Sequence, residues 1–127
     1  MAEKICLDTD VCISMIKGDQ KSVKLSDLIG SGKLFVTSIT VFELNLRSSN
    51  LQEIQSFLEG ILVLGFEEEC AIKASNIYKE LRSSGNILDF RDIFLAAIVI
   101  INNCSLITFN AKHFSRIKNL SLFDIEQ

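Results

Sequence analysis

Short runs of apolar residues alternate with longer segments whose apolar positions repeat at helical spacing. The short runs are rich in β-branched and aromatic residues and hold few polar positions, which is typical of strands buried on both faces. Four of these runs are predicted strands and the last is a candidate fifth strand: Lys4–Leu7, Leu34–Ser38, Ile61–Leu64, Ser105–Phe109 and Leu120–Ile125.

The segments between these runs are predicted helices. Gly18 and Gly60 end two of them, and the glutamates from Glu67 onward suit the positive end of a helix dipole. The predicted helices are Asp10–Ile16, Ser22–Ile29, Thr40–Leu46, Asn50–Leu58, Glu67–Leu81 and Leu88 to about Asn103. Buried strands separated by helices predict an α/β protein with three layers, α/β/α, around a central parallel sheet of four to five strands.

Composition and charge narrow the possible classes of protein. The 127 residues are enough to bury a core, and we expect one domain spanning residues 1–127. The chain is 48% hydrophobic and 23% charged, as in globular proteins, and its net charge of −3 gives no general attraction for nucleic acid. The apolar run Ile93–Ile101 is far shorter than the roughly 20 residues of a membrane span, so we expect no membrane association.

Four cysteines are scattered along the chain without a C-x-x-C pair. Most lie within apolar runs, so we interpret them as reduced thiols in the core. The N-terminus lacks the apolar stretch of a signal peptide. Together these features predict a cytoplasmic protein. The cysteines are Cys6, Cys12, Cys70 and Cys104.

Polar residues stand where the predicted strands end. Asp8 follows the first strand, Glu43 lies five residues past the second, and Asn110 follows the fourth. Asp89 and Asp92 open the helix before the fourth strand. Parallel sheets bind ligands beyond the carboxyl ends of their strands, and clustered carboxylates need a compensating cation. All-oxygen ligands suit Mg²⁺ or Mn²⁺, so this edge is a candidate metal site.

Each of these residues also has a structural explanation. Asp8 and Asp10 are as well placed to cap the first helix as to bind a ligand. The Asp89-x-x-Asp92 pair resembles an acidic capping box, so the local pattern favours two caps. Glu43 could simply face solvent, although apolar residues crowd around it, and Asn110 is also an ordinary turn residue. Because the acids all lie near strand ends, a shared metal site explains them better than four separate structural roles do.

Four motifs resemble those of the PIN-domain family of ribonucleases, especially the small VapC-like toxins of type II toxin–antitoxin pairs. LDTD resembles the first motif and places its metal-binding aspartate at Asp8, and SITVFEL resembles the second and places its glutamate at Glu43. DIFLAA resembles the third and points to Asp92, and LITFNAKHF resembles the last, with Asn110 at its polar position. The motifs occur in the family's order and cover essentially the whole chain.

The resemblance implies a PIN-like fold and a Mg²⁺- or Mn²⁺-dependent endoribonuclease that leaves 5′-phosphate and 3′-hydroxyl ends. Asp8, Glu43 and Asp92 would be the catalytic residues and the metal ligands. Asn110 and Asp89 would be secondary ligands. The family often has a fourth aspartate where this chain has Asn110, which adds no charge and would hold a second ion weakly.

The resemblance also implies supporting residues and partners. Asp10 and Thr108 would contact the ligand carboxylates rather than the ion, although Thr108 also fits an ordinary strand position. RNA would be the substrate, and toxins of this kind form homodimers inhibited by a small antitoxin protein.

The segment after the fourth predicted strand is the best candidate for contacts to RNA. Lys112, Arg116 and Lys118 would bind the phosphates, with a solvated loop as the alternative interpretation. His113 is interpreted as a surface or packing residue.

Other classes of protein fit less well. The strand followed by D-x-D also occurs in haloacid-dehalogenase-like phosphatases, but Cys12 stands where those enzymes have threonine or valine. A receiver-like module would need an aspartate after the third strand, and ILVLGF has none. A PIN fold that processes or binds RNA without acting as a toxin remains an alternative.

Overall fold

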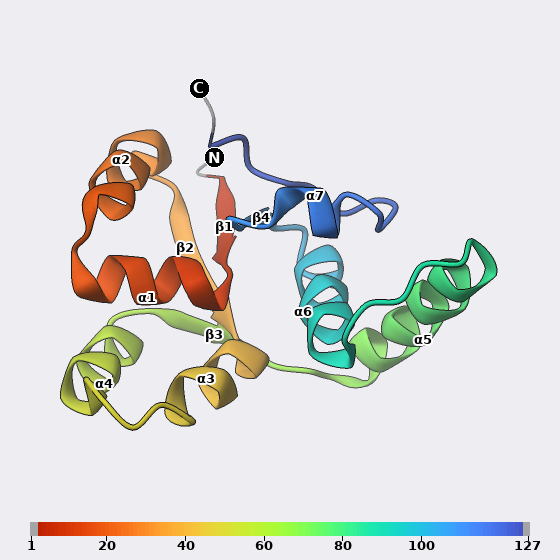
Figure 1. Cartoon of the computed structure of the whole chain (residues 1–127), viewed down its shortest axis with the longest axis horizontal. Helices are drawn as coiled ribbons and strands as arrows, with labels where there is room; N and C mark the ends of the chain where they lie inside the picture. The colour runs from red at the N-terminus through yellow and green to blue at the C-terminus, as the bar shows by residue number, and fades with distance from the viewer. Residues whose placement is uncertain (1–2, 126–127) are drawn as a thin grey trace.

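A four-stranded parallel sheet forms the centre of the computed structural model, which describes residues 3–125 (Figure 1). Its strands are paired in the order β3-β2-β1-β4, and every pairing is parallel. The predicted α/β class with a central parallel sheet is confirmed. The strands are β1 (Lys4–Leu7), β2 (Lys33–Thr37), β3 (Leu62–Leu64) and β4 (Ser105–Ile107).

Helices cover both faces of the sheet, which gives the predicted three layers. Four of them lie on one face and three on the other (Figure 1). The first group is α1 (Thr9–Lys17), α2 (Gln20–Ile29), α3 (Ser38–Asn45) and α4 (Leu51–Glu59). The second group is α5 (Glu68–Ser83), α6 (Phe90–Ile101) and α7 (Ala111–Phe114).

The alternation of side chains along β1 divides the core into two apolar clusters. Ile5 and Leu7 pack with the helices α1–α4, whereas Cys6 packs with α5–α7. Because strand side chains point alternately to opposite faces, a strand that is buried on both faces needs apolar residues at every position. This explains the unbroken apolar runs in the sequence.

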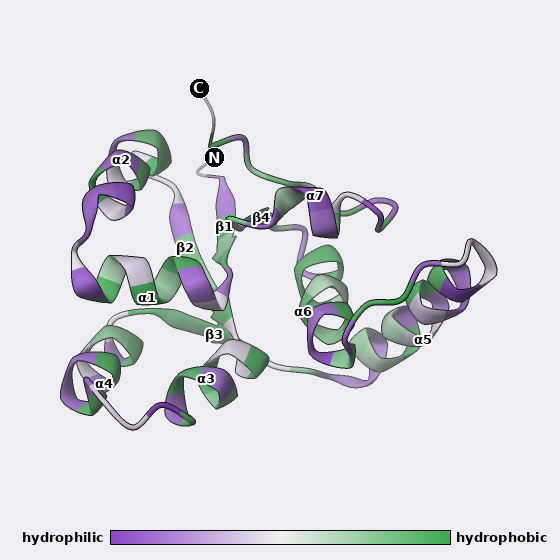
Figure 2. Cartoon of the chain, viewed as in Figure 1, coloured by the Kyte–Doolittle hydropathy of each residue, from purple (hydrophilic) through white to green (hydrophobic). Residues whose placement is uncertain are grey.

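The helix α6 lies against the sheet and is buried along most of its length. Its first turn carries the charged residues and is hydrophilic, and the rest is hydrophobic (Figure 2). Ala96 and Ala97 have no exposed surface. No helix within residues 3–125 is long and apolar enough to cross a membrane. The four cysteines are buried and free, as predicted.

The C-terminal part of the chain differs from the prediction in three ways. The fourth strand ends at Ile107 rather than Phe109, because the N–H of Asn110 donates to the hydroxyl of Thr108 and the chain turns there. Leu120–Ile125 is not a full strand, since Leu122 forms only an isolated bridge with Leu106. The short helix α7 was expected to be a loop. The six predicted helices lie within two residues of the observed bounds at each end.

Candidate functional site

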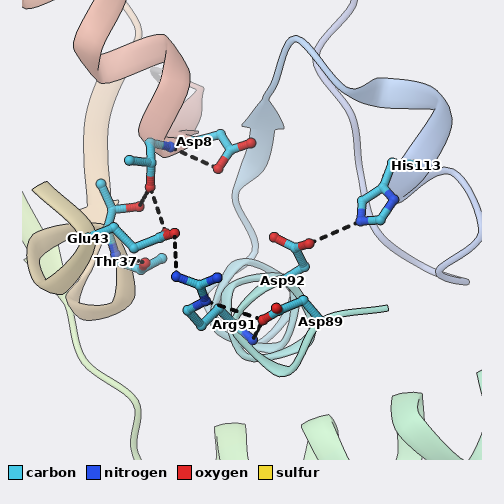
Figure 3. A network of polar contacts seen from close by, with 9 residues as sticks. Asp8, Thr37, Glu43, Asp89, Arg91, Asp92 and His113 are labelled. Atoms are coloured by element: carbon cyan, nitrogen blue, oxygen red, sulfur yellow. Dashed lines mark hydrogen bonds and ion pairs between the residues drawn. The ribbon is translucent and has the colours of Figure 1, made fainter. Parts of the chain in front are cut away.

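Three acidic side chains converge on the carboxyl edge of the sheet from three different elements (Figure 3). Asp8 directly follows β1, Glu43 lies in α3 just after β2, and Asp92 lies in the first turn of α6. The parallel pairing of β1 with β2 and β4 brings their ends together. The predicted grouping of these acids at one edge is therefore present.

Asp8 is both a helix cap and a member of the site. One carboxylate oxygen, Oδ1, accepts the N–H of Thr9 at 2.8 Å as the N-cap of α1, and Oδ2 accepts the hydroxyl of Thr108 at 2.8 Å. Burial raises the pKa of Asp8, and the negative charges of Asp92 and Asp10 raise it further, while the two hydrogen bonds oppose this shift. A raised pKa at a carboxylate edge indicates a position that a cation would stabilise.

Glu43 is fixed at both of its carboxylate oxygens. The hydroxyl of Thr9 donates to Oε1 at 2.9 Å, and Nη1 of Arg91 lies 3.5 Å from Oε2. The Thr9 hydroxyl is also 3.1 Å from that of Thr40. Thr9 therefore connects the start of α1 to α3, beside the cap at Asp8. This role of Thr9 was not predicted from the sequence, because its partners lie 31 and 34 residues further along the chain.

Asp89 caps α6, as predicted from the sequence. Its Oδ1 accepts the backbone N–H of Arg91 at 2.8 Å and lies 3.3 Å from Nε of the same residue. The backbone hydrogen bond and the guanidinium lower the pKa of Asp89. Arg91 thus lies between Asp89 and Glu43 at the mouth of the site (Figure 3). No role was predicted for this arginine from the sequence.

His113 faces Asp92, and the interpretation of this histidine as a surface or packing residue was incomplete (Figure 3). Its Nε2 lies 3.0 Å from Oδ2 of Asp92, and its ring meets Phe114 edge-on with 5.4 Å between the centroids. Phe114 is buried in the core, so α7 is anchored and holds the imidazole in place. The contact was missed because α7 itself was not predicted from its four residues.

The remaining predicted site residues lie at different distances from the acids. Thr108 contacts both Asp8 and the N–H of Asn110, so its expected contact with a ligand carboxylate is present. Asn110 is exposed at the start of α7. Asp10 is exposed in the first turn of α1, where its charge acts on Asp8.

The basic residues proposed to bind RNA do not form one patch. Lys112 lines a hollow next to Thr108 and Asn110. Arg116 and Lys118 line a different hollow, against the C-terminal end of α5. Of the three, Lys112 is therefore the one that shares a hollow with Thr108, the hydrogen-bond partner of Asp8.

The donor chemistry of the site fits a hard divalent cation. Asp8, Glu43 and Asp92 offer only oxygen atoms, the ligands that Mg²⁺ and Mn²⁺ prefer. Within residues 3–125, no three acidic, histidine or cysteine side chains are close enough to hold an ion as they stand. Glu43 is instead paired with Arg91 and Asp92 with His113, and an ion would compete with these partners. The side chains of Glu43 and Asp92 are 26% and 35% exposed, and such groups change rotamer readily.

Comparison with known proteins identifies the family. The PIN-domain profile matches residues 5–120. Ribonuclease VapC1 of Methanocaldococcus jannaschii is 31% identical over 94% of this chain and 85% of the relative. The tRNA(fMet)-specific endonuclease VapC of Shigella flexneri is 28% identical over 95% of this chain and 97% of the relative.

Solved structures agree with this assignment. A chain in the crystal structure of VapBC2 from Rickettsia felis bound to a promoter DNA fragment superposes with a TM-score of 0.81. It is 26% identical, with 94% of this chain and 97% of the other covered. Because the PIN-domain profile matches residues 5–120, the alternative of a haloacid-dehalogenase-like phosphatase is no longer needed. The chain therefore belongs to the PIN-domain family and, within it, to the VapC-like branch.

Proposed function

We propose that this chain is a divalent-metal-dependent endoribonuclease that hydrolyses RNA phosphodiester bonds and acts as the toxin of a toxin–antitoxin pair. The observation that carries this proposal is the convergence of Asp8, Glu43 and Asp92 on one edge of a parallel sheet. Relatives that carry the name ribonuclease or endonuclease support it. The active unit would be a single PIN-like nuclease domain spanning residues 1–127.

In this proposal Asp8, Glu43 and Asp92 hold Mg²⁺ or Mn²⁺, and Asn110 and Asp89 are secondary ligands. A bound divalent ion would lower the pKa of water and stabilise negative charge on the phosphodiester. The sum of three carboxylates in a partly buried site favours a divalent over a monovalent cation.

The chain's own residues keep the carboxylates in place. Thr108 fixes one oxygen of Asp8, and Thr9 fixes one oxygen of Glu43. Each leaves the second oxygen of its carboxylate to another partner: the Thr9 N–H on Asp8 and Arg91 on Glu43. The hydrogen bonds from Thr108 and Thr9 orient Asp8 and Glu43, whereas Arg91 and His113 would give way to an ion at Glu43 and Asp92.

Substrate and partners follow from the same reasoning. Lys112 would bind a phosphate of the RNA beside the acids, and Arg116 and Lys118 would contact more distant phosphates. An antitoxin partner is supported by the solved VapBC complexes of similar fold. A homodimer is part of the proposal, and an exposed apolar hollow of ≈ 670 Å³ between α5 and α6, with Phe90 59% exposed, offers a surface for it.

The test of the proposal is Asp92→Asn, which removes a ligand with almost no change in volume. We expect divalent-dependent cleavage of RNA to fall by more than about 100-fold. That is the largest loss usual for a residue that only contacts a metal ligand, and Asp92 would be a ligand itself. Asp27→Asn, the same change on the exposed face of α2, is the matched control and should cleave like the unmodified protein. Undiminished cleavage by Asp92→Asn would refute the assignment of this residue.

The toxin role needs a separate test, because a PIN fold that only processes RNA has the same site. Expression of the chain should arrest growth, and co-expression of the small protein encoded in the neighbouring reading frame should relieve the arrest. Cleavage in vitro without any effect on growth would favour the RNA-processing alternative.

A further inference from the structure

A surface hollow of ≈ 450 Å³ lies next to Thr108, the hydrogen-bond partner of Asp8, between the segment that leaves β4 and the segment that follows the bridge at Leu122. β4 is an outer strand of the sheet (Figure 1), and the hollow lies beyond its carboxyl end, where Thr108 and Phe109 follow Ile107. Its volume lies within the range of roughly 300–1,000 Å³ for small-ligand pockets. Its walls include Thr108, Phe109, Asn110, Lys112, Phe123 and Asp124.

The hollow and the acid site share a wall. Thr108 lines the hollow, and its hydroxyl donates to Oδ2 of Asp8 at 2.8 Å. The same hydroxyl accepts the N–H of Asn110, which also lines the hollow. A group bound in the hollow is therefore separated from Asp8 by a single side chain.

The lining combines aromatic surface with cationic and hydrogen-bonding groups. Phe109 and Phe123 are half-buried, and Asp124 adds an exposed carboxylate. Lys21 does not line the hollow, but its Nζ lies 4.8 Å from the centroid of the Phe109 ring. Lys112 is exposed at the rim, and Asn110 adds an amide. Single-stranded RNA is bound by aromatic rings that stack on bases, by amides that pair with base edges and by cations that contact the flanking phosphates.

The other hollows do not offer this combination next to the acids. The hollow between α5 and α6 is almost wholly apolar, and no residue that lines it hydrogen-bonds to a side chain of the three acids. The hollow around Phe57 lies between α1 and α4 and likewise has no lining residue that hydrogen-bonds to them. Only a site that adjoins Asp8 would place a base next to the phosphodiester to be cleaved.

We propose that the hollow between Thr108 and Phe123 binds one nucleobase of single-stranded RNA, adjacent to the phosphate at Asp8. This inference rests on the proposed ribonuclease function and adds to it a base-binding subsite. Phe123 and Phe109 supply the stacking surface, Asn110 contacts the base edge, and Lys112 contacts the flanking phosphate. The subsite gives the nuclease a preference for the base at one position of its substrate.

A tryptophan reporter tests the proposal, because the chain has no tryptophan of its own. Phe123→Trp places an indole in the hollow, and stacking of a base on it would quench its fluorescence. Phe57→Trp is the matched control, since Phe57 is half-buried in the same apolar cluster but lines the hollow between α1 and α4. Both variants carry Asp92→Asn, so that RNA is not consumed in Mg²⁺.

The probes are homopolymeric single-stranded A, C, G and U oligonucleotides and an abasic oligonucleotide of the same length. We expect at least one base to quench the Phe123→Trp variant saturably, and the abasic strand to bind about 5- to 100-fold more weakly, the cost of one stacking contact. The Phe57→Trp variant should not respond. Equal quenching by the abasic strand, or no quenching by any RNA, would overturn the proposal.

A second measurement separates this inference from the proposed function. In the unmodified active-site background, Phe123→Leu should lose base preference in cleavage, and Phe123→Tyr should retain it. If the unmodified chain cleaves RNA and Phe123→Leu cleaves it with the same base preference, the subsite is overturned and the proposed nuclease function stands. No cleavage by the unmodified chain would count against the proposed function instead. Emission that changes only with the antitoxin protein would assign the hollow to protein docking and overturn the subsite.

Discussion

Replacing Asp8 by asparagine removes a negative charge from the carboxyl edge of the sheet and keeps the size of the side chain. Burial raises the pKa of Asp8 from its ordinary value of 3.8, so the folded protein binds this proton more tightly than the unfolded chain does. The free energy of unfolding therefore falls as pH rises from about 3.8 through the folded-state pKa, and the loss is complete above it. The substituted asparagine would not titrate and would not show this loss.

The magnitude comes from two opposing contributions. Each unit by which the pKa is raised corresponds to about 1.4 kcal/mol of stability lost at neutral pH, which the asparagine recovers. Against this, the asparagine has one acceptor oxygen for the two donors Thr9 and Thr108, and a lost hydrogen bond costs about 1 kcal/mol. Asparagine caps helices as well as aspartate does. At pH 7 in chelator we expect the variant to be at least as stable as the unmodified chain, because the recovered cost of burying the charge opposes the lost hydrogen bond.

Thermal unfolding in chelator, followed by circular dichroism between pH 4 and pH 7.5, measures this difference. As pH rises, the free energy of unfolding of Asp8→Asn should increase relative to that of the unmodified chain. Asp8→Ala is the control that removes the charge and the cap together, and it should be less stable than Asp8→Asn by about 0.5–2 kcal/mol. A variant less stable by more than about 1 kcal/mol at pH 7, or a gap independent of pH, would refute the reasoning and assign Asp8 a purely structural role.

Two further predictions concern the neighbours of the acids and the core. Arg91→Gln should leave the thermal midpoint unchanged, because the ion pairs of Arg91 are exposed to solvent. It should raise the affinity for Mn²⁺ by up to about fivefold in calorimetric titration, because a cation beside Glu43 is lost. Weaker binding of Mn²⁺ would contradict this prediction. The four buried thiols should resist a disulfide reagent at pH 8 until the chain is unfolded, since burial raises the pKa of Cys6 and Cys12; rapid labelling of any thiol in the folded protein would contradict this.

The central layer of the fold was predictable because burial on both faces leaves a clear pattern. The apolar strand β1 and the long apolar run of α6 were both recognised from their pattern of apolar residues. The limits of the sheet at this side were less predictable: β4 was predicted to run from Ser105 to Phe109 but ends at Ile107, and the candidate fifth strand is a single bridge at Leu122. Pairing at an edge depends on where the chain turns, here at Thr108, and such turns leave weak signals in a sequence.

The site was predictable only as far as topology determines it. Parallel strands place Asp8 and the residue after β4 side by side, and the contact with Thr108 is one of the two interpretations that the sequence left open for this residue. The partners Arg91 and His113 were missed because side-chain pairing depends on helix placement. Asp89 and Asp92 have the same local pattern, and the structure separates them: one oxygen of Asp89 caps α6, whereas Asp92 faces His113.

The hydrogen bond between Thr108 and Asp8 joins residues 100 positions apart. During translation β1 and β2 can pair early, but Asp8 gains this partner only after β4 has left the ribosome. Asp92 gains His113 later still, when α7 is made. The ordered arrangement of acids is thus one of the last features to form during synthesis, so a chain able to cleave RNA would carry no finished site while most of it is being translated.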